Sequence, residues 1–197
     1  MKRLLYIIFP LAGIFFIVTT AFSKRSNPSE EKVIPANSFH SGDIILRESH
    51  GMLGELFKSF SLNERKFSHA GFINSVNGEI CVSHFTDEQK GVVCEKLSVF
   101  ISKDKCKSFA IFRPKYSISQ SMSIKQIIND PGNRLIPFDS KFDLSSDDAM
   151  YCTEWVYKCL IKVDIHTPLT QSKGGVYIAP DNLYINNLVK KIYEASY

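Results

Sequence analysis

The sequence predicts a single α+β domain, in which an antiparallel sheet or small barrel is flanked by helices. Short apolar runs alternate with turn residues, and Asn77-Gly78 between two of these runs is the strongest local signal for a β-hairpin. Other segments space their apolar residues three or four apart, as amphipathic helices do. A chain of 197 residues, 44% hydrophobic and 22% charged, has the length and composition of one globular domain.

Each expected element follows from a local pattern. The first strand follows a turn at Gly42, and the segment after it has apolar residues at helical spacing. Pro131-Gly132 ends a helical pattern that begins near Ser119. In chain order, the expected elements are a strand over 42–47, a helix over 51–62, strands over 69–74, 79–85, 91–97 and 108–113, and helices over 119–129, 151–161 and 181–195.

The N-terminal segment differs from the rest of the chain. Residues 4–22 form an uncharged apolar run behind Lys2 and Arg3, which is typical of an export signal or a membrane anchor. We therefore expect residues 1–23 to be a signal peptide or N-terminal anchor, 24–38 a linker and 39–197 the folded domain. An exported location, periplasmic or otherwise extracytoplasmic, follows from this reading, and the pattern leaves open whether the segment is cleaved.

Charge and cysteine content limit the classes of function. The net charge of +4 is spread over mixed signs, so we set nucleic-acid binding aside. Five cysteines leave at least one thiol unpaired. Cys81 and Cys94 lie on neighbouring predicted strands and could form a disulfide, but the sequence alone does not show that pairing.

Cys152 begins the predicted helix over 151–161. A buried structural cysteine is one interpretation, because Cys152 shares a helix face with Val156 and Cys159. A nucleophile is the other, since the unpaired amides at a helix N-terminus stabilise a thiolate and can bind an oxyanion. Asp147 and Asp148 would oppose thiolate formation if they lay close.

His69 begins a predicted strand, and the small residues Ala70 and Gly71 after it leave space for a substrate or a helix. A hairpin that turns at 77–78 would bring His84 next to His69, where it could orient the first ring. Two histidines and a thiolate could also hold zinc, but the usual close ligand spacing is missing and we rank this reading lower. His40, His50 and His166 are expected to be solvated.

Five short motifs occur in a fixed order along the chain. They are Gly42-Asp43-Ile44-Ile45-Leu46, Phe67-Ser68-His69-Ala70-Gly71-Phe72, Pro137-Phe138-Asp139 with Phe142, Tyr151-Cys152-Thr153-Glu154-Trp155-Val156, and Pro180-Asp181-Asn182-Leu183. Together they resemble the circularly permuted papain-like enzymes of the NlpC superfamily, specifically the YiiX-like (YebB-like) branch. The order of histidine before cysteine fits such a permutation, and the resemblance spans roughly residues 42–183.

The resemblance implies a permuted papain-like fold in which Cys152 is the nucleophile, His69 the general base and acid, and His84 the orienting residue. The family commonly has a glutamate at this third position. Histidine stands at a comparable place in the lecithin retinol acyltransferase group, so the role remains open to His84; Glu79 and Glu154 are fallback candidates. The resemblance implies neither a metal nor an organic cofactor. The oxyanion and substrate-binding residues that it implies are Tyr151, Asp43, Phe138 and Asp139.

The sequence thus predicts a cysteine-dependent amide hydrolase that acts on a peptide or small amide substrate, with cell-wall peptides as the class suggested by kinship and export. A thiol acyltransferase or lipid hydrolase on the same fold is the first alternative, favoured if residues 4–22 hold the protein at a membrane. A non-catalytic binding module is the second.

Overall fold

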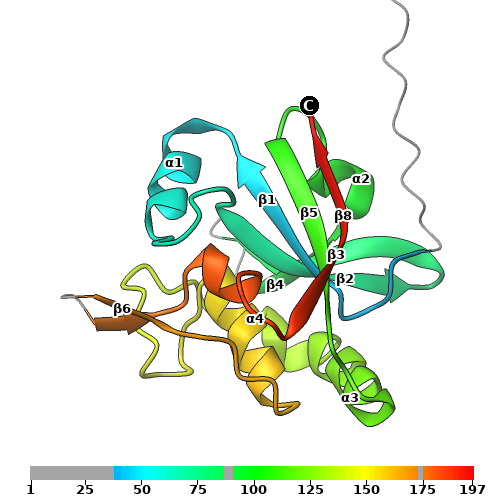
Figure 1. Ribbon diagram of the computed structural model, residues 1–197. Helices are drawn as coiled ribbons and strands as arrows, with labels where there is room; N and C mark the ends of the chain where they lie inside the picture. Colours follow the sequence, from blue (N-terminus) through cyan, green and yellow to red (C-terminus); the bar gives the residue numbers. More distant parts are fainter. Residues whose placement is uncertain (1–37, 87–90, 173–174) are drawn as a thin grey trace, which may run out of the picture. The chain divides into compact units, whose positions relative to one another are not determined.

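The computed structural model describes residues 38–86, 91–172 and 175–197, and these contain a six-stranded antiparallel sheet flanked by helices (Figure 1). The strand order is β4-β3-β2-β1-β5-β8, and β6 and β7 form a separate hairpin. The strands are β1 Ile44–Ser49, β2 His69–Val76, β3 Glu79–Phe85, β4 Val92–Lys96, β5 Cys106–Pro114, β6 Thr170–Ser172, β7 Gly175–Tyr177 and β8 Val189–Ser196. The helices are α1 Gly51–Ser59, α2 Leu97–Phe100, α3 Ile118–Ile128 and α4 Cys152–Ile161, with 3₁₀ turns η2 Pro131–Arg134 and η3 Pro180–Leu183.

The hairpin between β2 and β3 sets the register of the sheet around the predicted site. It turns at Asn77 and Gly78, whose φ angles are 52° and 81°, as a two-residue hairpin turn requires. Gly71 then lies directly opposite His84, and β2 pairs on its other side with β1. The hairpin predicted from Asn77-Gly78 is confirmed.

The two faces of the sheet are buried by different elements. Side chains such as Leu46, Phe72 and Phe112 belong to one apolar core with Trp155 and Leu160 of α4. The alternate residues along the strands point to the opposite face, where Ile45, Ile73, Val82, Phe109 and Ile111 are also buried. The α+β architecture predicted from the sequence is confirmed, and α4 packs directly against β2.

The predicted helix over 181–195 is wrong. The chain instead forms η3 and then β8, which pairs antiparallel with β5 and makes an edge of the sheet. Apolar residues at helical spacing suggested a helix, but β5 offers unpaired backbone groups that only a strand can satisfy. Tyr193 also stacks on Phe109 with 5.7 Å between ring centroids, which stabilises the strand arrangement.

A disulfide joins Cys81 of β3 to Cys94 of β4. The pairing that the sequence left open therefore exists in the structure. It links two neighbouring strands near the edge of the sheet, and it leaves Cys106 and Cys159 buried and Cys152 partly buried as free thiols among the described residues.

The leader, anchor and linker predicted for residues 1–37 lie outside the described residues. Within the described ranges, the helices are all too short or too polar to span a membrane.

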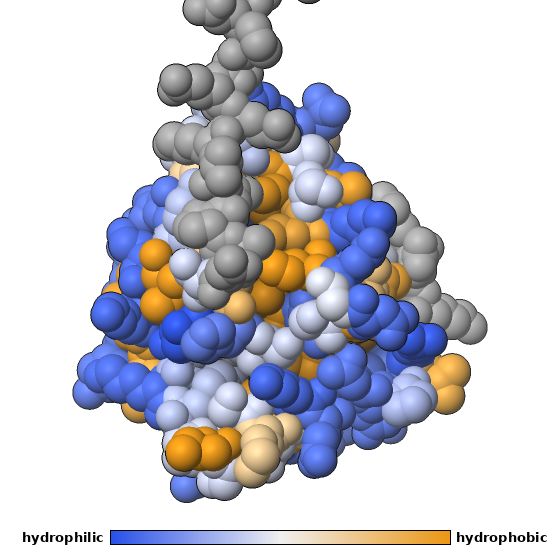
Figure 2. Space-filling view, turned by 90° about the vertical axis from the view of Figure 1, so that its right-hand side faces the viewer, coloured by the Kyte–Doolittle hydropathy of each residue, from blue (hydrophilic) through white to orange (hydrophobic). Residues whose placement is uncertain are grey.

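One side of the molecule, seen in Figure 2, has hydrophobic residues in the middle and hydrophilic residues around them. Apolar atoms contribute more than half of the surface of ordinary folded proteins, so such a patch does not by itself indicate a site.

Candidate active site

Cys152 is the first residue of α4, and the start of this helix is held by its own third residue. The backbone N–H of Tyr151 donates to Glu154 Oε2 at 3.2 Å, and Lys158 Nζ lies 2.8 Å from Glu154 Oε1. Glu154 is fully buried, and burial raises the pKa of its carboxyl despite the bond to Lys158. Glu154 therefore fixes the helix start instead of orienting a histidine.

The thiol of Cys152 lies against β2 at Ala70, the residue that follows His69. Burial raises the pKa of this thiol, while hydrogen bonds from the backbone amides of Ala70 and Thr153 lower it. The net direction is upward, so burial outweighs the helix-terminal effect that the sequence suggested. The thiol therefore needs a base to become a nucleophile at neutral pH.

His69 and His84 contact each other directly. His69 Nε2 lies 2.9 Å from His84 Nδ1, and the rings meet edge to face with 5.0 Å between centroids. Burial lowers the pKa of both rings, that of His69 well below its usual value, with the charge of Arg47 acting in the same direction. Both imidazoles are thus neutral near pH 7, the state in which His69 can accept a proton.

Gly71 allows the two histidines to approach. A Cβ atom at this position would lie 2.7 Å from the carbonyl oxygen of Ser83 and 2.8 Å from His84 Cβ, closer than such atoms pack. Because Gly71 is directly opposite His84 in the ladder, any side chain here would displace the second histidine. The small residues after His69 therefore serve the packing of the neighbouring strand and of α4.

Glu95 on β4 is a residue of this site that the sequence analysis missed. Its Oε2 lies 3.6 Å from His84 Nε2, its Oε1 lies 2.5 Å from Lys105 Nζ, and Arg47 Nη1 is 3.9 Å from Oε2. The nearby His84 ring lowers the pKa of Glu95 to about 2, with Lys105 adding to the effect. The available signal was its place in the strand, since Glu95 is two residues after Val93, which pairs with His84.

Three of the other predicted site residues lie near the start of α4. Phe138 forms a parallel bridge with Met150, and the Asp139 N–H donates to the Met150 carbonyl at 3.1 Å. Phe138 and Asp139 also line a cavity of about 280 Å³ with Ser140, Lys141, Asp143, Ser146 and Ala149. The Tyr151 side chain is buried, and its hydroxyl oxygen accepts from the Ile178 N–H at 2.9 Å. These positions are compatible with substrate contact, which stays a prediction.

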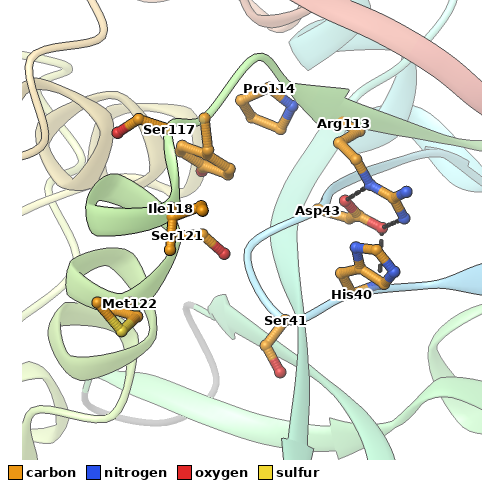
Figure 3. A pocket seen from close by; sticks show the side chains of 10 residues that line it. His40, Ser41, Asp43, Arg113, Pro114, Ser117, Ile118, Ser121 and Met122 are labelled. Atoms are coloured by element: carbon orange, nitrogen blue, oxygen red, sulfur yellow. Dashed lines mark hydrogen bonds and ion pairs between the residues drawn. The ribbon is translucent and has the colours of Figure 1, made fainter.

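Asp43 is not brought to this site. It precedes β1 at the end where Ile44 pairs with Phe72, whereas Arg47 at the far end of the strand pairs with His69. Asp43 is buried and forms a two-pronged ion pair with Arg113, with both N–O distances 2.8 Å (Figure 3). Asp43 thus lies at the opposite end of β1 from Arg47, which pairs with His69, and it has a structural contact in Arg113, while its substrate role stays a prediction.

The remaining candidates are on the surface. Glu79 forms an exposed pair with Lys96 at 3.5 Å, while His50 and His166 are exposed and bonded to Lys103 and Asp164. Across residues 38–86, 91–172 and 175–197, no group of three or more His, Cys, Asp or Glu side chains is arranged to hold a metal ion.

Comparison with known proteins places this arrangement in context. The model of a family described as "Permuted papain-like amidase enzyme, YaeF/YiiX, C92 family" matches residues 38–184. A crystal structure of metalloprotein yiiX from Escherichia coli O157:H7 has a TM-score of 0.66 at 16% sequence identity, and the match covers 81% of this chain and 99% of that one. No curated protein matches the sequence.

Proposed function

Because the chain belongs to the YaeF/YiiX (C92) family of permuted papain-like amidases and is a cysteine hydrolase, we propose that Cys152 attacks an amide carbonyl with His69 as its base. The contact between His69 Nε2 and His84 Nδ1 supports this proposal most strongly. This contact occupies Nε2 of His69 and leaves Nδ1 available for the thiol. The Sγ atom of Cys152 lies against Ala70, the residue of β2 that follows His69. His84 orients the base.

The reaction follows from these positions. His69 Nδ1 takes the thiol proton as Cys152 Sγ bonds to the carbonyl carbon, and the backbone N–H of Cys152 stabilises the oxyanion. His69 then gives its proton to the amine as the C–N bond breaks, which leaves a thioester. Water attacks the thioester with His69 again as base, and the acid and the thiol are released.

A peptide is our first candidate substrate. The cavity beside Phe138 has mainly polar and charged walls, which suit a peptide better than an acyl chain. The chain has a disulfide, and its apolar N-terminal run follows two positively charged residues. Both features fit export to an oxidising compartment, where cell-wall peptides are found. We therefore place the proposed activity outside the cytoplasm.

A lipid or N-acyl substrate is the second candidate, and α1 is the observation that favours it. Met52, Leu53 and Leu56 are exposed on this helix. Behind them, Phe57 and Phe60 contact Phe142, which contacts Tyr151 next to the nucleophile. A continuous series of apolar side chains thus extends from the surface toward Cys152, against which an acyl chain could pack.

The test is the rate of Cys152 alkylation by iodoacetamide against pH, measured by peptide mapping on the full-length protein. We expect His69→Ala to slow alkylation at pH 7 at least about tenfold and to move the reaction to alkaline pH, where the thiol ionises unaided. Cys152→Ser should abolish hydrolysis of peptide or N-acyl amide substrates, and the preferred substrate separates the two classes. His50→Ala, an exposed histidine, is the control.

Equal alkylation of Cys152 in the unmodified and His69→Ala proteins would contradict the assignment of nucleophile and base. Together with a lack of hydrolysis, it would favour the binding-module alternative.

A further inference from the structure

The carboxylate of Glu95 lies beside Nε2 of His84, the ring nitrogen that does not contact His69. His84 Nε2 and Glu95 Oε2 are 3.6 Å apart, slightly longer than a hydrogen bond, and both atoms are buried without a hydrogen-bond partner among the described residues. The His84 side chain is only 4% exposed. The two groups therefore satisfy each other or remain unsatisfied.

Glu95 is held in place by cations from two other elements. Lys105, which precedes β5, contacts Oε1 at 2.5 Å, and Arg47 of β1 lies 3.9 Å from Oε2. Arg47 itself donates to the Phe100 carbonyl at 2.9 Å and stacks over the Phe100 ring, which contacts both histidines. The carboxylate is thus ionised and fixed, and it can only accept hydrogen bonds.

The positions of the protons follow from this one constraint. Because Glu95 only accepts, His84 carries its proton on Nε2. His84 is neutral, so its Nδ1 has a lone pair and accepts a proton from His69 Nε2 across the 2.9 Å contact. His69 is neutral too, and its Nδ1 is then the unprotonated nitrogen, which is what a base for a thiol needs.

We propose that Glu95 is a positioning residue of this enzyme, which acts through His84 to fix the reactive tautomer of His69. The inference rests on the proposed roles of Cys152 and His69. The carboxylate of Glu95 comes from β4, the strand next to the one that carries His84. When His69 takes up the thiol proton, the same carboxylate offsets the positive charge on the histidine pair.

The sharpest variant is Glu95→Gln, which keeps the shape of the side chain. Lys105 Nζ can only donate, so the amide oxygen of the glutamine faces Lys105 and the NH₂ group faces His84. His84 Nε2 must then accept, its proton moves to Nδ1, and His69 is forced into the opposite tautomer. We expect Cys152 alkylation at pH 7 to fall roughly 10- to 100-fold, as is typical when an orienting partner is lost.

Two controls separate positioning from simple loss of structure. Glu79→Gln removes an exposed carboxylate on the adjacent strand and should leave alkylation unchanged. In a His84→Asn background, adding Glu95→Gln should cause no further change, because the partner through which Glu95 acts is gone. An effect of Glu95→Gln that is equally large in both backgrounds would show a general structural role and overturn the proposal.

A second measurement uses the unmodified chain and does not depend on any variant folding. The ¹⁵N chemical shifts of the imidazole rings at pH 7 should show both His69 and His84 protonated on Nε2 alone. A proton on Nδ1 of His84 would overturn the inference. If instead His69→Ala has no effect on Cys152 while the ¹⁵N shifts are as expected, the proposed function fails and with it the role of Glu95 in the reaction, and only the assignment of the two tautomers stands.

Discussion

Individual side chains around the thiol show which local signals were informative. His84 was predicted to approach His69 from the hairpin turn alone, since a two-residue turn fixes the register of every later pair. Glu95 was missed because its contacts with His84, Lys105 and Arg47 come from three other segments of the chain, which only the sheet brings together. Asp43 belongs to a motif that resembles a site segment, and the structure adds an ion pair with Arg113 that the motif did not indicate.

Gly71 provides a test of the packing that places His84. Gly71→Ala should destabilise the fold by about 1–3 kcal/mol, because the new methyl group meets the backbone of β3. It should also slow Cys152 alkylation, since His84 must move. Chemical denaturation and alkylation rates measure the two effects.

Gly78→Ala is the matched control for this prediction. Gly78 has a φ of 81° but no neighbouring atom within reach of a Cβ, so the variant should lose stability without a change at Cys152. Identical alkylation rates for both variants would argue against the steric account of Gly71.

Helices and strands differ in how far local sequence determines them. α3 is specified by its own ends, because Ser117 accepts from the Gln120 N–H at 3.2 Å while the Gln120 side chain accepts from the Ser117 N–H at 2.8 Å. β8 is specified by β5, its neighbour in the sheet, and its own residues gave the wrong answer. The predicted boundaries were therefore close for α3 and wrong in type for β8.

Removing the cap of α3 should have a local cost. We expect Ser117→Ala to lower the free energy of unfolding by about 1 kcal/mol, because the Gln120 N–H loses its acceptor. Thermal unfolding would measure this loss, and Ser123→Ala on the exposed side of the same helix is the control. Because α3 supplies none of the proposed catalytic residues, Cys152 alkylation should be unchanged in Ser117→Ala, and a loss of alkylation would contradict this prediction.

The complete domain brings together residues from β1, β2, β3, β4 and α4. Cys152 and His69 belong to motifs that can be recognised in the sequence. The charged residues Glu95 and Arg47 come close to the histidines only because of the strand order β4-β3-β2-β1. The order of the motifs was enough to predict the class of fold and the class of enzyme. The motifs do not predict the substrate, because no local pattern describes the shape of a surface such as the cavity beside Phe138, which we propose as a substrate site.

The disulfide between Cys81 and Cys94 has a consequence for how the enzyme should be handled. It ties the strand that carries His84 to the strand that carries Glu95. Mild dithiothreitol should raise the rate of hydrolysis by rescuing oxidised Cys152, and stronger treatment should lower it again by releasing β4. We expect an optimum in activity at intermediate dithiothreitol concentration. A Cys81→Ser, Cys94→Ser double variant should lack the falling limb, whereas a monotonic rise in the unmodified protein would show that β4 holds Glu95 without the crosslink.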